Sequence, residues 1–180
     1  FKNFNQILTP SDRTAKSFKK LLPNSSVFIS GDSRFDQMLY RKNNNKQPSI
    51  FSDIDSVKTI IFGSIDKSDY DILFQALKQF FPKGDISLKE KQIRLIVVPH
   101  EVDYKTTDEI VSLLKGLNIE PTLYSQNKKT ISNVSIVDIV GILADLYKYC
   151  DLAYIGGGFK NDKIFGQSGV HSVIEPCAYE

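Results

Sequence analysis

The residues best suited to ligand binding form a glycine triplet, Gly156-Gly157-Gly158, followed directly by Phe159. Five of the ten glycines fall between residues 156 and 169. Such a triplet can adopt positive φ and bring the backbone close to a ligand, with amides that could face a phosphate or a carboxylate. It is neither a G-x-G-x-x-G pattern nor a P-loop, since no GK[ST] follows. A simple turn without a ligand is the alternative interpretation.

A second candidate is the segment Gly169–Pro176, which contains His171, Ser172 and Glu175. We expect a helix to begin near His171, so that its first amides could face an anion. His171 and Glu175 would share one face of that helix and offer a donor and a carboxylate to a ribose. An exposed helix face without a ligand is the alternative. A metal site is disfavoured because no third ligand of matching spacing is evident.

Two further segments carry polar groups that could bind an anion. In Gly31–Asp36 the guanidinium of Arg34 is a planar fork for phosphate or carboxylate, although an ion pair with Asp32 or Asp36 would also explain it. In Pro99-His100-Glu101 the histidine follows an apolar run. No serine lies in a G-x-S-x-G nucleophile elbow, so a Ser-His-Asp triad has no support.

The elements that would position these residues alternate regularly along the chain. Apolar strands are expected at 27–29, 57–62, 93–98, 121–124, 134–137 and 152–155. Amphipathic helices are expected from about 9 to 22 and over 35–41, 69–81, 107–117 and 141–149, with a last one beginning near 171. This alternation predicts an α/β fold, a Rossmann-like parallel sheet with helices on both faces.

Ligands of such sheets bind at the carboxyl ends of the strands. The segments expected at that edge are Gly63-Ser64, Pro99-His100-Glu101, Asp138–Gly141 and Gly156–Phe159. The pattern therefore predicts that they lie together, although they are far apart in the chain.

The length, charge and composition of the chain disfavour several classes of protein. The chain has 180 residues, 20.4 kDa and a net charge of +2, which suits one domain or a domain plus a fragment and disfavours a general nucleic-acid binder. The apolar runs are too short to cross a bilayer, and the start lacks a signal peptide. Cys150 and Cys177 cannot form a disulfide framework. Because the chain starts at Phe1 and stops inside an expected helix, we expect it to be a piece of a longer protein.

Taken in order, the motifs resemble the C-terminal half of bacterial 3-deoxy-D-manno-octulosonic acid (Kdo) transferases. The resemblance covers nearly the whole chain and rests on GDSRFD at 31–36, GS at 63–64, VVPHE at 97–101, VSIVDIVGILADLYKYCDLAYIGGGF at 134–159 and GVHSVIEP at 169–176. It implies that residues 1–30 are the tail of a preceding N-terminal domain with its connection. Residues 31–180 would then be a donor-nucleotide-binding domain, truncated at its C-terminus.

The resemblance implies a GT-B glycosyltransferase of lipopolysaccharide biosynthesis, in which two Rossmann-like domains face a cleft. The donor would be CMP-Kdo and the acceptor a lipid A precursor, with no cofactor and no nucleic acid. The complete protein would act at the cytoplasmic face of the bacterial inner membrane, held there by its N-terminal part. The family's catalytic base is a glutamate of the N-terminal domain, so no catalytic residue is assigned in this chain. The fragment alone is expected to be inactive.

The same resemblance implies which residues bind the substrate. Glu175 would take the ribose hydroxyls, the helix start at His171-Ser172 would favour the phosphate, and Arg34 would lie at the interdomain side. The remaining residues around CMP would be Gly63, Ser64, Pro99, His100, Gly141, Gly156, Gly157, Gly158 and Phe159.

The sequence departs from the family at several of these places. Ser172 stands where the family usually has Asn, and Gly63-Ser64-Ile65-Asp66 replaces its G-S-T segment. An insertion, Asn161–Gln167, separates the glycine triplet from His171. Two other readings stay open: another GT-B glycosyltransferase or a sugar-nucleotide epimerase, and a non-catalytic nucleotide-binding or interaction module.

Overall fold

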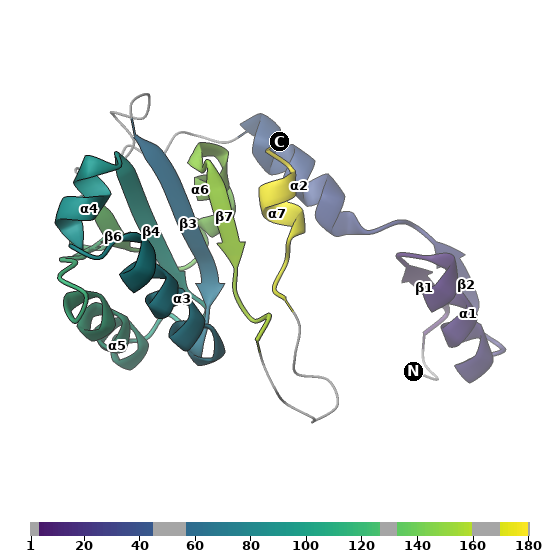
Figure 1. The fold of residues 1–180 in the computed structure, drawn as a ribbon. Helices are drawn as coiled ribbons and strands as arrows, with labels where there is room; N and C mark the ends of the chain where they lie inside the picture. Colours follow the sequence, from purple (N-terminus) through teal and green to yellow (C-terminus); the bar gives the residue numbers. More distant parts are fainter. Residues whose placement is uncertain (1–3, 45–56, 127–132, 160–169, 180) are drawn as a thin grey trace. The chain divides into compact units, whose positions relative to one another are not determined.

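The computed structural model describes residues 4–44, 57–126, 133–159 and 170–179. The chain divides into two compact units, Phe1–Asn44 and Asn45–Glu180, which are drawn in Figure 1. Helix α2 (Ser33–Asn44) belongs to the first unit, whereas the sequence-based boundary lies after residue 30. The assignment of residues 1–30 to a preceding domain stays a prediction. The insertion Asn161–Gln167 lies outside the described residues.

The first unit is built on two parallel strands, β1 (Gln6–Thr9) and β2 (Ser26–Ile29), joined by helix α1 (Asp12–Leu21). Ser11 caps α1, since its hydroxyl accepts a hydrogen bond from the amide of Thr14. Thr9 is buried at the end of β1, and its hydroxyl donates to the carbonyl of Phe28, 3.1 Å away. Helix α2 then follows β2 and is longer than the predicted 35–41.

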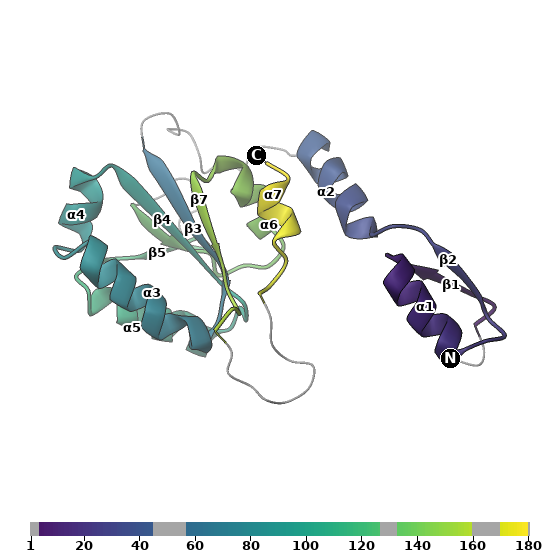
Figure 2. The ribbon, with the colours of Figure 1, turned by 45° about the vertical axis from the view of Figure 1, so that its right-hand side comes forward.

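The second unit contains a five-stranded, fully parallel sheet. Its strands are β3 (Lys58–Ile65), β4 (Ile93–Pro99), β5 (Thr122–Leu123), β6 (Val134–Ile136) and β7 (Leu152–Ile155). They lie in the order β5-β6-β4-β3-β7, and Figure 2 shows the long central strands β3 and β4 beside β7. The expected strand 57–62 thus continues through Gly63-Ser64 to Ile65.

Helices cover both faces of this sheet. Leu95 and Val97 of β4 pack in one apolar cluster with α3 (Lys67–Phe80), α4 (Asp85–Glu90) and α5 (Tyr104–Lys115). Ile96 and Val98 point the other way, into a cluster with α6 (Leu143–Leu146) and the 3-10 helix Tyr147–Tyr149. This alternation, with period two along the strand, confirms the predicted α/β fold. No helix in the described part of the chain is long and apolar enough to span a bilayer.

In the second unit, three helices differ clearly from the sequence-based expectation. The six-residue α4 was not predicted, because so short a segment has too few positions for a clear helical period. The predicted helix 141–149 is interrupted: α6 has four residues and passes into the 3-10 turn. The last helix, α7 (Ile174–Cys177), begins three residues later than the predicted start at 171.

Candidate functional site

The order of the strands reverses between β3 and β7. The chain leaves β3 for β4 on one side, and β7 pairs with β3 on the other side. In open parallel sheets, ligands bind outside the carboxyl ends of the strands at such a switch point. The candidate site of the second unit is therefore the edge formed by the ends of β3 and β7.

Backbone hydrogen bonds join four of the predicted segments at this edge. The amide of Gly156 donates to the carbonyl of Gly63 at 2.9 Å, and the amide of His100 donates to the carbonyl of Ile65 at 2.9 Å. The amide of His171 in turn donates to the carbonyl of Gly156 at 3.0 Å. The segments around residues 63, 100, 156 and 171 are thus neighbours, as their expected places at strand ends predict.

The two histidines of the chain stack on each other at this edge. The ring centroids of His100 and His171 are 4.1 Å apart, with an angle of 15° between the ring planes. Nε2 of His171 lies 4.0 Å from Oδ2 of Asp66, the N-cap residue of α3. Imidazole donors beside a carboxylate acceptor can bind hydroxyl and phosphate groups, and nothing in the local sequence predicts the stack.

The glycine triplet ends β7 in a tight turn whose shape requires glycine at two positions. A Cβ on Gly156 would lie 2.2 Å from the carbonyl oxygen of Ser64, and Gly157 has φ of +88°. The amide of Gly157 donates to both carboxylate oxygens of Asp69, at 3.0 and 3.2 Å. The amides of Gly156 and Gly157 are therefore bound to protein acceptors. The expectation that they face a ligand is wrong for these two, while Gly158 and Phe159 are exposed.

Asp69 and Tyr154 are site residues that the sequence analysis missed. The side chain of Asp69 is fully buried in the first turn of α3. Besides Gly157, it accepts hydrogen bonds from the amide of Asp66 at 2.9 Å and from the hydroxyl of Tyr154 at 2.7 Å. Burial and then this hydrogen bond raise the pKa of Tyr154. The aspartates three residues apart at the end of a strand are a capping-box signal that could have revealed Asp69.

Residues 170–173, before α7, have no regular secondary structure, and the prediction of a helix beginning near His171 is wrong. The hydrogen bond of the His171 amide to Gly156 continues the pairing at the end of β7, which holds this backbone away from helical geometry. His171 and Ser172 therefore precede the helix, and His171 does not share a helical face with Glu175. The helix N-terminus that the resemblance places at residue 171 for the phosphate is absent there.

Glu175 lies in the first turn of α7 and is half-buried. Burial, and secondly the negative charge of Glu175, raise the pKa of Tyr147 above its ordinary value, so the two side chains are close. Tyr147 fills the space beside Gly63, where an added Cβ would be 2.0 Å from its hydroxyl oxygen. Glu175 and Gly63 are thus linked through one buried tyrosine.

The other predicted residues differ in how closely they are packed. Ser64 has φ of +53° at an irregularity in the β3–β4 register, and Pro99 is buried at the end of β4. Gly141 has φ of +91°, and a Cβ there would meet no atom within 4 Å. Among the described residues, no backbone hydrogen bond of the kind that holds Gly156 ties Gly141 or Phe159 to the edge.

A hollow of about 500 Å³ runs along β7, between this strand, the 3-10 helix and α7. It is lined by Tyr147, Ile155, Val173 and Pro176, among others, and by both cysteines of the chain. Within the described residues, no three His, Cys, Asp or Glu side chains are grouped so as to hold a metal ion.

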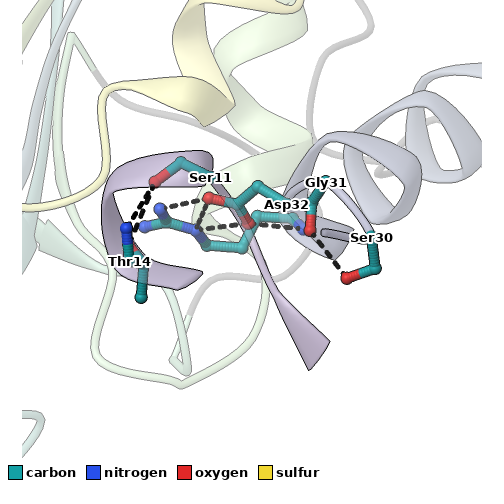
Figure 3. Close-up of polar contacts among 6 residues, drawn as sticks. Ser11, Thr14, Ser30, Gly31 and Asp32 are labelled. Atoms are coloured by element: carbon teal, nitrogen blue, oxygen red, sulfur yellow. Dashed lines mark hydrogen bonds and ion pairs between the residues drawn. The ribbon is translucent and has the colours of Figure 1, made fainter. Parts of the chain in front are cut away.

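Arg34 belongs to the first unit and is bound to Asp32, one of the alternatives left open by the sequence. Nε of Arg34 donates to Oδ1 of Asp32 at 2.9 Å. Figure 3 shows this acceptor, Asp32, together with Ser30 and Gly31 and with the Ser11–Thr14 pair at the start of α1. Hydrogen bonds from Arg34 lower the pKa of Asp32 to about 2. A hollow of about 440 Å³ lies at these strand ends, lined by Thr9, Ser30 and Arg34 among others.

Comparisons with known proteins confirm the resemblance to Kdo transferases. The chain is 27% identical over 179 residues to a 3-deoxy-D-manno-octulosonic acid transferase of Chlamydia muridarum, which covers 98% of this chain. It is 29% identical over 124 residues to the protein of that name from Chlamydia pneumoniae, covering 68% of this chain. A bifunctional glycosyltransferase/methyltransferase of Fusobacterium nucleatum is 27% identical over 158 residues, covering 86%. No protein-family model matches the sequence.

A solved structure confirms the fold. The C-terminal CMP-Kdo binding domain of WaaA from Acinetobacter baumannii matches with a TM-score of 0.54 and 17% identity, over 81% of this chain and 66% of that one. The chain spans only 35% of the Chlamydia muridarum transferase, 25% of the Chlamydia pneumoniae protein and 21% of the Fusobacterium protein. This chain thus shares the fold of that domain and spans only a part of the length of its curated relatives.

Proposed function

We propose that this chain is the donor-binding part of a glycosyltransferase that transfers Kdo from CMP-Kdo to a lipid A precursor. The observation that carries the proposal is the convergence of the segments at 63–65, 100, 156–157 and 171 at the switch point of a parallel sheet. These are the segments in which the chain resembles the Kdo transferases. The names of the Chlamydia relatives and of the Acinetobacter domain support the same donor.

In this proposal the cytidine monophosphate lies over the carboxyl ends of β3 and β7. The stacked His100 and His171 provide imidazole donors for the phosphate, and Glu175 accepts the ribose hydroxyls. Ser64, Pro99, Gly158, Phe159 and Ser172 border the nucleotide, with Gly141 at the periphery. Gly63, Gly156 and Gly157 shape the edge and do not themselves bind the donor, because their space or amides are already taken.

The complete transferase would act at the cytoplasmic face of the bacterial inner membrane, because a lipid A precursor is a membrane lipid. Sugar transfer requires a base placed against the acceptor hydroxyl. In the Kdo transferases that base belongs to the N-terminal domain, so we propose that this chain binds the donor without turning it over. The place of Arg34 at the interdomain side stays a prediction.

The proposal is tested by titrating the 180-residue chain with CMP and following its amide NMR signals. We expect weak binding, since the resemblance assigns the other half of the cleft to the N-terminal domain, with shifts concentrated at Gly63, His100, Gly156 and His171. UMP is the matched control, because it differs only in the base, and it should bind more weakly. Equal binding of UMP would favour another glycosyltransferase or an epimerase. Shifts confined to residues far from this edge would overturn the site.

A further inference from the structure

The glycine turn after β7 is held by one side chain, the buried carboxylate of Asp69. Its two oxygens receive the amide of Gly157, the amide of Asp66 and the hydroxyl of Tyr154, at distances between 2.7 and 3.2 Å. The three donors come from the turn, from the start of α3 and from β7. One carboxylate therefore connects the two strand ends that form the switch point.

Asp69 occupies the place that an anionic ligand takes in other glycine turns. Backbone amides with positive φ commonly cradle phosphate or carboxylate, and here the carboxylate comes from the chain itself. The bound turn also directs the rest of the edge, because the carbonyl of Gly156 accepts the amide of His171. The stack of His171 on His100 and its approach to Asp66 thus depend on the position of this turn.

We propose that Asp69 is a positioning residue for donor binding: it holds the Gly156–Gly158 turn in the shape that sets His171 against His100 at the nucleotide. The inference rests on the proposed function. A carboxylate suits the task better than an amide, because three donors converge on it and an asparagine would direct its NH2 group toward one of them. Because Asp69 is fully buried, water cannot easily take the place of a lost hydrogen-bond donor, and breaking one of these bonds costs free energy. The arrangement is therefore rigid.

The test compares the CMP affinity of the 180-residue chain with that of Asp69→Ala, Asp69→Asn and Tyr154→Phe. Asp69→Ala leaves all three donors unpaired and should raise the Kd for CMP about tenfold or more. Asp69→Asn keeps the volume and one oxygen, and should have a smaller effect. Tyr154→Phe removes a single donor while keeping the ring beside Phe62, and should change Kd less than about threefold. If Asp69→Ala does not fold, the Kd values of Asp69→Asn and Tyr154→Phe test the proposal instead.

Asp103→Ala is the matched control. Asp103 caps the neighbouring helix α5 by accepting the amide and the hydroxyl of Thr106, and it makes no hydrogen bond to the glycine turn. This variant should lower thermal stability through the lost cap but leave the Kd for CMP unchanged. All affinities are measured at a temperature at which circular dichroism shows every variant folded.

Hydrogen exchange of the Gly157 amide shows whether the turn itself is released, and the Kd for CMP of the folded variants shows whether that release reaches the donor site. Exchange should accelerate about tenfold in Asp69→Ala and stay unchanged in Asp103→Ala. An unchanged Kd in the folded Asp69 variants, or an unchanged Gly157 exchange rate, would overturn the positioning role while leaving the donor site standing. Failure of the unmodified chain to bind CMP would overturn the proposed function, and with it this role.

Discussion

Two turns in this protein each combine a glycine and an aspartate, but the aspartate has an exposed partner in one turn and buried partners in the other. In each, a parallel strand ends near a glycine with positive φ, Gly31 after β2 and Gly157 after β7, and an aspartate carboxylate accepts hydrogen bonds nearby. Asp32 is bound by the exposed guanidinium of Arg34, whereas Asp69 is bound by backbone amides and a tyrosine in the interior. A ligand can break the exposed Arg34–Asp32 pair at little cost in free energy. The buried hydrogen bonds of Asp69 cannot be broken so easily.

The comparison suggests a division of roles. A solvated ion pair contributes little to stability, so Arg34 is available to a phosphate or carboxylate of a ligand. The buried Asp69 is satisfied by the protein alone and maintains the shape of the edge. Polar groups at a ligand site thus include those that contact ligand and those that only set the geometry, and burial distinguishes them.

The largest expected effect comes from Gly156→Ala. The added Cβ would lie 2.2 Å from the carbonyl oxygen of Ser64 and 2.7 Å from Cα of Ile65, both in the backbone of a central strand. We expect a loss of about 3 kcal/mol or more in unfolding free energy. Gly141→Ala, a position with positive φ but open space, should cost about 1 kcal/mol. Chemical denaturation of both variants measures the difference, and equal losses would show that the turn after β7 is not closely packed.

Glu175→Gln should affect the donor more than the fold. A carboxylate that accepts ribose hydroxyls contributes charge-assisted hydrogen bonds, so its loss should weaken CMP-Kdo binding by the complete transferase about tenfold. Thermal stability should change little, because glutamine keeps the volume of the half-buried side chain. A much lower melting temperature with unchanged donor affinity would instead place Glu175 with Asp69 among the residues that set geometry.

The smallest expected effect concerns the exposed pair of the first unit. Hydrogen bonds from Arg34 lower the pKa of Asp32 from its ordinary value near 3.8 to about 2. Because the folded-state pKa is depressed, the pair's contribution is present above pH 3.8 and is lost as the pH falls toward 2. In Arg34→Ala, the NMR titration midpoint of the Asp32 carboxyl should return toward 3.8, with no measurable change in melting temperature at pH 7. An unshifted midpoint in the unmodified chain would show that the pair does not form.

Much of the fold could be predicted from the sequence because its signals are local. The continuous apolar runs 57–62 and 93–98 belong to β3 and β4, and the helical spacing within 69–81 and 107–117 belongs to α3 and α5. Each of these segments is long enough for its period to be unambiguous. The short α4 and the start of α7 were missed, since four to six residues contain less than two turns of that period.

The sequence predicts which edge of the sheet forms the candidate site, but not how the residues at that edge are arranged. Strand ends rich in glycine and histidine indicate the carboxyl edge of a parallel sheet, and Gly63, His100, Gly156 and His171 do meet there. The place of Arg34 at the interdomain side also stays a prediction. The expected helix does not begin at His171, because the amide of that residue is hydrogen-bonded to the distant carbonyl of Gly156.

The sequence by itself determined the alternation of strands and helices, the two apolar faces of β4 and the polar groups at the strand ends, because these depend on neighbouring residues. Only the tertiary structure decided the strand order, the stack of His100 on His171 and the hold of Asp69 on Gly157, a partner 88 positions away along the chain. The periodicity of neighbouring residues contains no information on such pairs. They form because burial requires every donor and acceptor to find a partner, and the folded sheet determines which partners are within reach.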